Sequence, residues 1–243
     1  MKRPFKRRLG RASPHIGQGE PISIAGASLV AELAGALYWP HEGILAVADL
    51  HLEKGSSFAV RGSMLPPYDT HDTLERLRRL IDHYDPRCVI ALGDSFHDRR
   101  GGSRLSEPDR ASIKELQRGR DWIWITGNHD PDRMENIAGT FVAKLAVGPL
   151  TFRHDPTPDG PEGEIAGHLH PVARVGVSSG SVRRRCFIHD GRRMIMPALG
   201  AYAGGLNVRD RAFSSLFDRR AFTVHVLGSS RVYEIGALHC LPD

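Results

Sequence analysis

The strands predicted from this sequence share the feature that most constrains its fold: they end in aspartate, asparagine or histidine. A strand that only fills a core gains nothing from such an ending, because a buried polar group without a partner is costly. In α/β sheets, ligands collect beyond the carboxyl ends of strands. We therefore expect five segments to deliver side chains to one common edge: Asp49-Leu50-His51 after LAVA, Gly93-Asp94 after VIAL, Gly127-Asn128-His129-Asp130 after WIWIT, His154 after TFR, and Gly167-His168-Leu169-His170 after GEIA.

Hydrophobic periodicity predicts helices between the earlier strands. Apolar residues recur at helical spacing over 68–85, with Asp72 or Thr73 as the predicted N-cap, and a second helix is expected over 107–118. The chain after residue 143 has the pattern of short strands joined by turns. The alternation in the first half predicts an α/β fold with helical crossovers. Its strands are expected at 22–24, 28–31, 36–39, 44–48, 88–92 and 121–126.

One domain accounts for most of the chain. No internal repeat, low-complexity tract or linker divides residues 19–243, so we predict a single domain there. Residues 1–18 carry six Lys and Arg among Gly, Pro and Ser, and we interpret them as a flexible basic arm. Such an arm either binds a polyanion or is simply a solvated terminus, and the composition is consistent with both.

Charge and cysteine content limit the environment and the partners. The formal net charge of +5 and the pI of about 9.4 favour polyanionic partners. The three widely spaced cysteines suggest neither a disulfide framework nor a sulfur-ligated metal, so we expect reduced thiols in a cytoplasmic protein. No apolar run approaches the roughly 20 residues of a membrane-spanning helix, and no membrane partner is expected.

The polar residues at the strand ends suit a divalent cation. Oxygen and imidazole donors without thiolates favour Mn, Fe, Zn or Mg over copper(I) or an iron–sulfur cluster. One residue separates Asp49 from His51, which lets both reach the same ion from an irregular turn just past the strand. Glycines at 93, 127 and 167 each precede a candidate ligand and permit close backbone packing around an ion. Each piece alone is weak, but their joint occurrence in this order indicates a metal site.

The ordered set of motifs resembles that of the calcineurin-like metallophosphoesterase superfamily. The motifs of that superfamily run D-x-H, G-D, G-N-H-[DE], a separate H, and G-H-x-H, and the match covers about residues 40–175. The resemblance implies a four-layer αββα sandwich of two mixed sheets, with the metals at the sheet edges. The strand pattern is compatible with this fold but does not specify it.

A narrower resemblance extends over nearly the whole chain after the basic arm. The segments DLHLEKGSSFA, LPPYDT, LGDSFHD, GHLHP and HDGRRMIMPALGAYAGGLNV resemble the bacterial ligase-associated DNA-damage-response phosphoesterases, the PdeM branch. This branch implies a manganese-dependent phosphodiesterase or endonuclease in DNA repair, associated functionally with an ATP-dependent DNA ligase and a helicase. The expected partner is nucleic acid, DNA in the first instance, contacted through its backbone phosphates.

The superfamily roles carry over to matching positions as ligands of two divalent cations, with Mn expected and Fe or Zn as alternatives. Two cations about 3.5–4 Å apart can hold a bridging hydroxide and clamp phosphoryl oxygens. Two carboxylates leave an excess of about two positive charges, which the hydroxide and one phosphodiester would neutralise. The implied reaction is in-line attack of this hydroxide without a covalent enzyme intermediate. The first metal would take Asp49, His51, Asp94 and His170, and the second Asp94, Asn128, His154 and His168, with Asp94 bridging.

His129 and Asp98 are the predicted catalytic residues outside the ligand set. His129 adjoins Asn128 without a metal of its own, so we predict that it is the general acid that protonates the leaving alkoxide. Asp98 is predicted to orient His129 and raise its pKa. A salt bridge from Asp98 to Arg99 or Arg100 is the alternative.

Arg99 and His97 are predicted to bind substrate, Arg99 through a fork of donors to phosphate. A solvated arginine is the alternative for Arg99. Many phosphatase relatives have Asp and Arg three and four residues after the G-D aspartate, whereas here Asp98 and Arg99 follow Asp94 by four and five. This departure leaves the role of Asp98 open. Asp130 is expected either to orient a ligand or to cap a helix.

Three functions are consistent with these observations. The first is a dinuclear phosphodiesterase or endonuclease acting on nucleic acid, and the second is the same chemistry on a small nucleotide or cyclic-nucleotide ester. The third is a non-catalytic scaffold, which the complete ligand set disfavours. The basic stretches 183–185 and 192–193 either follow a phosphate backbone or are solvated faces.

Overall fold

Residues 44–48, ILAVA, form a strand that is buried along its whole length, and this strand defines the layers of the molecule. The computed structural model describes residues 16–60, 62, 68–130, 137–158 and 160–243. Ile44 and Ala46 pack in a cluster with residues of a second sheet, whereas Leu45 and Val47 pack in a cluster with helices. This is the period-two alternation of an extended chain that is covered on both faces.

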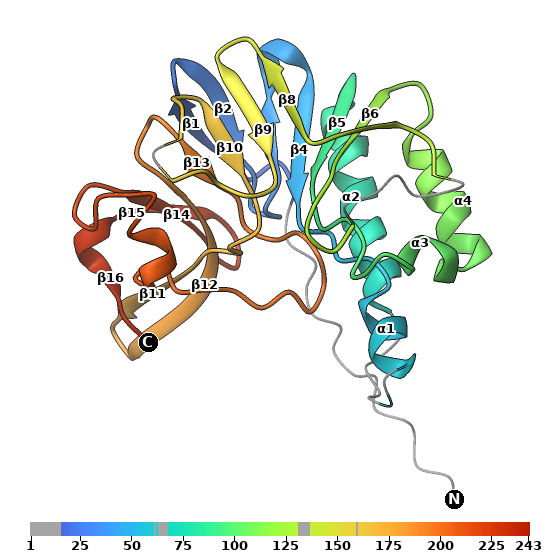
Figure 1. Cartoon of the computed structure of the whole chain (residues 1–243). Helices are drawn as coiled ribbons and strands as arrows, with labels where there is room; N and C mark the ends of the chain where they lie inside the picture. The colour runs from blue at the N-terminus through green and yellow to red at the C-terminus, as the bar shows by residue number, and fades with distance from the viewer. Residues whose placement is uncertain (1–15, 61, 63–67, 131–136, 159) are drawn as a thin grey trace, which may run out of the picture.

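The first sheet has seven strands arranged in the order of the sequence (Figure 1). Its first four strands pair antiparallel, and the pairs from the fourth to the seventh are parallel. The parallel half confirms the predicted crossovers, since helices connect its central strands. The strands are β1 (Glu20–Ile24), β2 (Ala27–Ala31), β3 (Leu37–Trp39), β4 (Ile44–Ala48), β5 (Cys88–Leu92), β6 (Asp121–Ile125) and β7 (Thr140–Val142).

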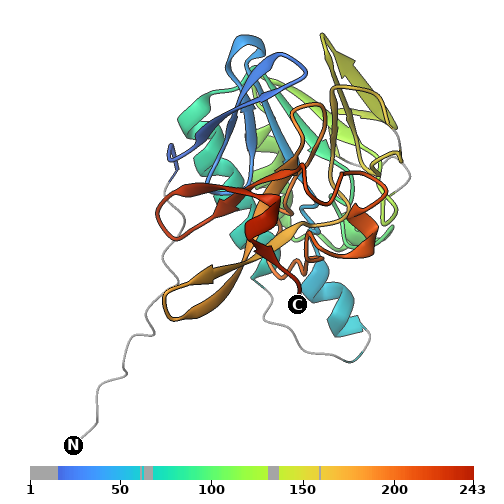
Figure 2. The same ribbon diagram turned by 90° about the vertical axis from the view of Figure 1, so that its left-hand side faces the viewer.

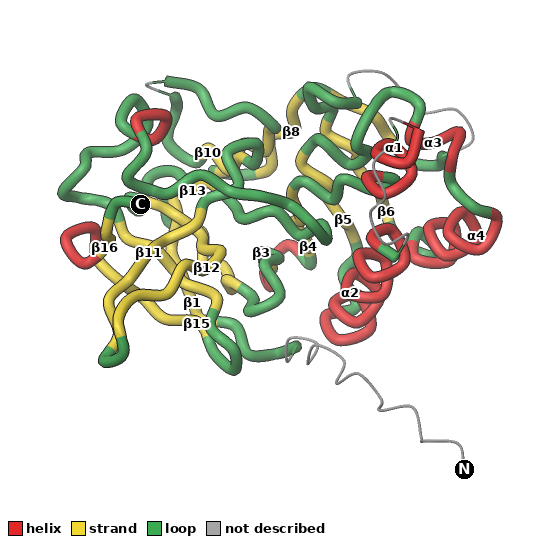
Figure 3. Tube along the Cα trace, turned by 90° about the horizontal axis from the view of Figure 1, so that it is seen from below, coloured by secondary structure: helices red, strands yellow, loops and turns green. Residues whose placement is uncertain are grey.

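The α-helices of the described residues gather on one side of the molecule (Figure 3). The helix predicted over 68–85 buries its leucine stripe against the first sheet. Its predicted cap is wrong, because the helix begins at Asp69, before Asp72 and Thr73, and its N-cap Tyr68 makes no capping side-chain bond. Short helices at 54–60 and 101–104 were not predicted. The helices are α1 (Lys54–Val60), α2 (Asp69–Tyr84), α3 (Gly101–Arg104) and α4 (Glu107–Leu116).

The second sheet is built from the later half of the chain, as predicted, and is also mixed. β9, β10 and β13 pair in parallel, and the other pairs are antiparallel. Its main path runs β15-β14-β12-β13-β10-β9-β8, with β11 on β12 and β16 on β11. The strands are β8 (Lys144–Val147), β9 (Leu150–Arg153), β10 (Glu164–Ala166), β11 (Val172–Val177), β12 (Gly180–His189), β13 (Met194–Ile195), β14 (Thr223–Leu227), β15 (Val232–Gly236) and β16 (Cys240–Leu241).

Three apolar clusters separate the layers. One lies between α2, α4 and the first sheet, and one lies between the two sheets. The third covers the outer face of the second sheet with Phe213, Phe217 and Phe222, next to the 3₁₀ helix η2 (Arg211–Phe213). Figure 2 views the molecule from this side, with the C-terminal strands toward the viewer. The predicted two-sheet sandwich is confirmed, and its outer layer on this side is 3₁₀ helix and loop.

The N-terminal segment is described only from residue 16. Residues 1–15, most of the predicted basic arm, lie outside the described residues. Ile16 packs against the helical cluster, and the Gly17 N–H donates to Glu32 Oε2 at 3.3 Å. No described helix combines the length and the apolar character needed to cross a bilayer. Cys88, Cys186 and Cys240 are free thiols.

Candidate metal centre

The strand ends that carry the predicted ligands meet at one edge between the two sheets. β4, β5 and β6 are parallel neighbours, as are β9 and β10, so their carboxyl ends lie side by side. The backbone ties the sheets together there, since the Leu199 N–H donates to the Ala48 carbonyl at 2.8 Å. In Figure 1 this edge faces downward, where the chain leaves β4 toward α1.

Asp49, His51 and His170 form one group of ligand atoms. Asp49 is fully buried directly after β4, and His51 is also buried. The Nε2 atoms of His51 and His170 are 3.2 Å apart, and His170 Nε2 lies 3.3 Å from Asp49 Oδ1. One ligand atom from each residue lies within 4.8 Å of the others, which fits a single cation. We call these three residues the first group.

Asp94, His154 and His168 form a second group by the same measure. His154 Nε2 lies 3.4 Å from Asp94 Oδ1 and 3.2 Å from His168 Nδ1. The Asn128 amide nitrogen lies 3.4 Å from His168 Nδ1. His154 Nδ1 is also 3.7 Å from Asp49 Oδ1, so the two groups adjoin. The structure thus brings all seven residues predicted as ligands to one place.

The backbone is strained at most of these residues. A left-handed φ costs a residue other than glycine about 1–2 kcal/mol, and such strain persists mainly where function requires it. The sequence predicted an irregular turn after β4 but gave no sign that the strain recurs at the other strand ends. Positive φ angles occur at Asp49 (52°), His51 (44°), Asp94 (43°), His168 (68°) and His170 (46°).

Two of the predicted glycines are required by close approach. A Cβ on Gly93, whose φ is +64°, would lie 2.4 Å from the His154 ring. A Cβ on Gly127 would lie 2.2 Å from the Asp94 backbone nitrogen. Since neither neighbour can move without displacing a candidate ligand, only glycine fits at these positions.

The two groups differ in protonation. Burial, followed by the neighbouring His170, lowers the pKa of His51 to about 3, so this ring is neutral at pH 7. Burial acts to lower the pKa of His154 as well, but the Asp94 hydrogen bond and Asp49 outweigh it and raise the pKa to about 9. Burial acts to raise the pKa of Asp94, yet its hydrogen bond with His154 holds that pKa well below the usual range. At pH 7 His154 is therefore an imidazolium that lies between the carboxylates of Asp94 and Asp49.

The donor set fits a pair of divalent cations. It consists of imidazole nitrogens and carboxylate or amide oxygens, which suit Mn, Fe or Zn. His154 Nδ1 lies 3.2 Å from the Leu92 carbonyl. Because a carbonyl only accepts, Nδ1 carries the hydrogen, and Nε2 is left as the ligand atom facing Asp94 and His168.

His129 lies beside both groups. Its backbone N–H donates to Asp94 Oδ1 at 2.9 Å, and its Nε2 is 3.8 Å from Asp94 Oδ2. Its Nδ1 is 2.7 Å from the His97 carbonyl, so Nδ1 must carry a hydrogen and Nε2 is the nitrogen that can exchange a proton. The rings of His97 and His129 stack with centroids 5.4 Å apart, and the His51 ring meets His129 edge-on at 5.5 Å.

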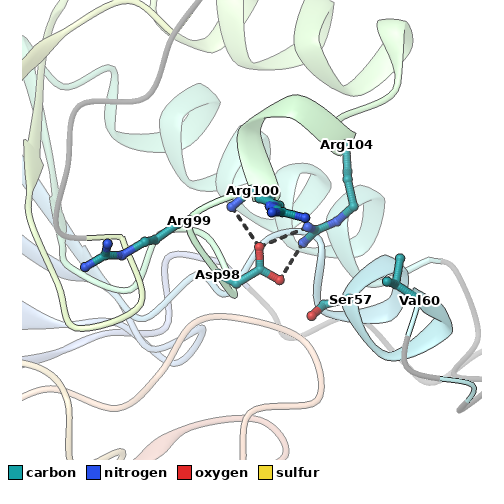
Figure 4. A pocket seen from close by; sticks show the side chains of 6 residues that line it. All are labelled: Ser57, Val60, Asp98, Arg99, Arg100 and Arg104. Atoms are coloured by element: carbon teal, nitrogen blue, oxygen red, sulfur yellow. Dashed lines mark hydrogen bonds and ion pairs between the residues drawn. The ribbon is translucent and has the colours of Figure 1, made fainter.

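Asp98 forms a salt bridge, but its guanidinium partner is Arg104. The two side chains share hydrogen bonds of 2.9 and 2.8 Å, and the Arg100 backbone N–H donates to Asp98 at 2.8 Å (Figure 4). Burial acts to raise the pKa of Asp98, but Arg104, Ser57 and Arg100 lower it to about 2. Arg99 extends away from Asp98 in Figure 4. Among the described contacts, Asp98 reaches His129 only through the neighbouring His97 backbone.

Two acidic residues near the motifs have contacts that the sequence did not specify. Asp130 is buried and accepts N–H bonds from Gly127, Ser95 and Phe96, and it therefore fixes the turns around Asp94. The alternative of a helix cap concerns residues 131–136, which lie outside the described residues. Asp155 Oδ1 lies 3.3 Å from His168 Nδ1 and 3.3 Å from the Asn128 amide nitrogen. Its position directly after His154 was the available signal for this contact.

The basic stretches divide into surface and structural residues. Arg183 and Arg184 are exposed on β12. Arg185 instead donates to the Ala198 and Ala34 carbonyls. Arg193 is buried and donates to carbonyls of the loop after His154. The prediction of a solvated face therefore holds for part of these stretches only.

One family model and two solved structures are similar to this chain. The family model described as calcineurin-like phosphoesterase matches residues 43–191. The crystal structure of the nuclease MPE from Pseudomonas putida is similar with a TM-score of 0.70 and 27% identity, covering 89% of this chain and 100% of that one. YfcE, a phosphoesterase from E. coli, matches with a TM-score of 0.40 and 12% identity over 80% of this chain and 98% of that one. No curated protein matches this sequence.

Proposed function

The chain belongs to the calcineurin-like phosphoesterase family, and from this premise we propose that it hydrolyses phosphodiester bonds of nucleic acid as an endonuclease. Membership makes it a metal-dependent phosphoric ester hydrolase with a dinuclear centre. The nucleic-acid substrate is our inference. It is supported by the similarity to the P. putida nuclease over the whole length of that chain, and by the net charge of +5.

The observation that carries the proposal is the adjacency of the two ligand groups. Asp49, His51 and His170 would hold one cation, Asn128, His154 and His168 would hold the other, and Asp94 would be shared by both. Contacts of 3.4 Å to Asp94 and 3.7 Å to Asp49 place His154 between the groups. When bound, the two cations supply an activated water and stabilise negative charge on the phosphoryl oxygens.

His129 supplies the proton for the leaving alkoxide in this proposal. The His97 carbonyl holds Nδ1–H at 2.7 Å, which aims the opposite nitrogen, Nε2, toward Asp94 and the centre. In the imidazolium form, Nε2–H is the donor to the leaving oxygen. Asp98 acts indirectly, because its bonds to Arg104 and the Arg100 N–H fix the backbone that carries His97. His97 and Arg99 are proposed substrate contacts at the rim of the centre.

We also propose manganese as the native metal and DNA repair as the role, in functional association with an ATP-dependent DNA ligase and a helicase. The support is the resemblance of segments such as LGDSFHD and GHLHP to the PdeM branch. The donor set is compatible with manganese and equally with iron or zinc.

A cleavage panel tests the proposal. The purified protein is assayed with Mn, Ni, Co or Zn on supercoiled plasmid, single-stranded oligonucleotide, a cyclic nucleotide and bis-p-nitrophenyl phosphate. We expect Mn-dependent cleavage of nucleic acid that is lost in Asp94→Asn and kept in Asp121→Asn, a matched change at an exposed strand start. Hydrolysis of the small esters alone would contradict the nucleic-acid substrate. No hydrolysis with any metal would contradict catalysis altogether.

A further inference from the structure

A pocket of about 350 Å³ has Asp98 and Arg99 among its lining residues, and the proposed mechanism names no group that occupies it. Its volume is at the small end of the range of about 300–1,000 Å³ that is typical of ligand sites, so it suits a small group rather than a folded partner. Figure 4 shows its walls, which come from α1 and from the segment that leads into α3. The lining residues are Ser57, Val60, Asp98, Arg99, Arg100 and Arg104.

The pocket carries an excess of positive charge. Three guanidinium groups and one carboxylate line it. The carboxylate, Asp98, is already paired with Arg104 through two hydrogen bonds. Arg100 is exposed, and within the described part of the chain no carboxylate pairs with its guanidinium. Its backbone is held in place by the bond from its N–H to Asp98. Arg100 therefore has an anchored backbone and an exposed guanidinium that no described carboxylate neutralises, which suits an anionic ligand.

The pocket adjoins the centre on the side of His129. His97 directly precedes the pocket residue Asp98, and its ring lies 5.8 Å from that of His51 and 5.4 Å from that of His129. From α1, Phe58 adjoins the pocket residue Ser57 in sequence and lies 5.7 Å from the His97 ring. One wall of the pocket thus begins at His97, which borders the candidate ligand His51, and the other wall contacts His97 through Phe58. A ligand in the pocket and a phosphate at the centre would be neighbours.

We propose that this pocket binds the phosphate next to the scissile one in a polynucleotide, with Arg100 as its main contact. The inference rests on the proposed function and deepens it, because it names what distinguishes the substrate from a small ester. A guanidinium presents a planar fork of donors that matches phosphate oxygens. A polynucleotide carries a second phosphate one nucleotide away from the first, whereas a cyclic mononucleotide or bis-p-nitrophenyl phosphate has only one phosphate. A polynucleotide can therefore engage the centre and the pocket together, and these small esters cannot.

The test uses substrates that differ by one terminal phosphate. Hydrolysis is compared for the thymidine dinucleotide with free ends, for the same dinucleotide with a 5′- or a 3′-phosphate, and for bis-p-nitrophenyl phosphate. In the wild type we expect one of the two phosphorylated forms to have a kcat/KM about tenfold above the unphosphorylated form, as for one partly exposed charge-assisted contact. Arg100→Ala should remove this gain while changing kcat/KM for the other three substrates less than about twofold.

Matched variants separate the contact from general charge. Arg192→Ala removes another exposed arginine, in the turn after β12, and should keep the full preference. Arg100→Lys should keep part of it, because the charge remains but the fork is lost. Thermal unfolding should be unchanged in all three variants. Arg100→Gln serves as a second neutral variant if the alanine variant is unstable.

The outcomes distinguish this inference from the function on which it rests. Equal kcat/KM on all three dinucleotides in the wild type, or a preference that survives in Arg100→Ala, would overturn the pocket assignment and leave the proposed function standing. A loss in Arg100→Ala of the same size on bis-p-nitrophenyl phosphate would also overturn it. Cleavage of plasmid and oligonucleotide without hydrolysis of either phosphorylated dinucleotide by the wild type would overturn the pocket assignment alone. No hydrolysis of these substrates, of plasmid or of oligonucleotide would overturn the proposed function, and the pocket assignment with it.

Discussion

The two ligand groups consist of the same residue types but have different surroundings. In the first group, Asp49 and His51 are buried, and the His170 side chain is only 18% exposed. The second group opens to solvent on one side, where the His168 side chain is 36% exposed and its partner Asp155 is 50% exposed. Burial lowers the pKa of His51 in the first group, so its ring is neutral at pH 7. In the second group Asp94 and Asp49 raise the pKa of His154, so its ring is protonated at pH 7. Similar ligand lists can therefore describe sites with different affinity, exchange and pH response.

The largest predicted effect concerns His129, which contacts the second group through Asp94. His129→Ala should lower kcat by about a hundredfold or more on esters with an alkoxide leaving group, because it removes the proton donor. The loss should be much smaller on bis-p-nitrophenyl phosphate, whose leaving group needs no proton. Rates on both substrates at saturating metal measure this. Equal losses on both would show that His129 supports the structure of the centre instead.

Metal affinity should depend on pH at one group and not at the other. Although burial opposes it, the two aspartates raise the pKa of His154 to about 9. Below pH 9 a cation must displace this proton, so affinity at the second group should rise about tenfold per pH unit up to about pH 9 and then level off. His51, with a pKa of about 3, imposes no such competition on the first group. Calorimetry in buffers of different ionisation enthalpy measures the protons that the protein releases as each ion binds. We expect about one proton for the ion at the second group and none for the ion at the first. If neither ion, or each of the two ions, displaced a proton on binding, the predicted difference in pH dependence between the two groups would be wrong.

Asp155→Asn should affect the second group alone. Asp155 contacts His168 and Asn128, so removing its carboxylate should lower the metal affinity of the second group about 10- to 100-fold, as for other residues that orient ligands. We expect this group to be the weaker of the two metal sites. The tighter site should be unchanged. Competition with a chelator resolves the two affinities, and Asp190→Asn, in a turn away from the centre, is the control. Parallel weakening of both sites would mean that the groups cannot be treated separately.

The smallest effect tests the backbone strain at His168. At φ 68° an alanine is as strained as a histidine, whereas a glycine is not. In the metal-free protein, His168→Gly should therefore be more stable than His168→Ala by about 1 kcal/mol, the reverse of the order in a helix. Urea unfolding of the two variants measures the difference. An alanine variant as stable as the glycine variant would show that the site is not strained.

The sequence predicted the ligand groups because each ligand follows a strand that is apolar and short. The ends of β4, β5 and β6 could be aligned from the alternation of strands and helices alone, since right-handed crossovers keep parallel strands side by side. The second sheet could not be derived in this way. β12 pairs with β14 across more than thirty residues, and no local pattern encodes such a pairing.

The residues that contact the site residues also could not be predicted from the sequence. The partner of Asp98 is Arg104, six positions away, because the short helix α3 turns the chain back toward it. The sequence suggested only the adjacent arginines. The contact of Asp155 with His168 joins the ends of two different strands, so it follows from the fold and not from spacing. Turn conformation and long-range packing, rather than residue type, determine which residues Asp98 and Asp155 contact.

Anomalous diffraction from crystals soaked in Mn²⁺ tests the central claim most directly. The account predicts two manganese peaks about 3.5–4 Å apart. One should be contacted by Asp49, His51 and His170, and the other by Asp94, His154 and His168. A single peak, peaks elsewhere on the molecule, or no peak with these side chains in place would contradict it.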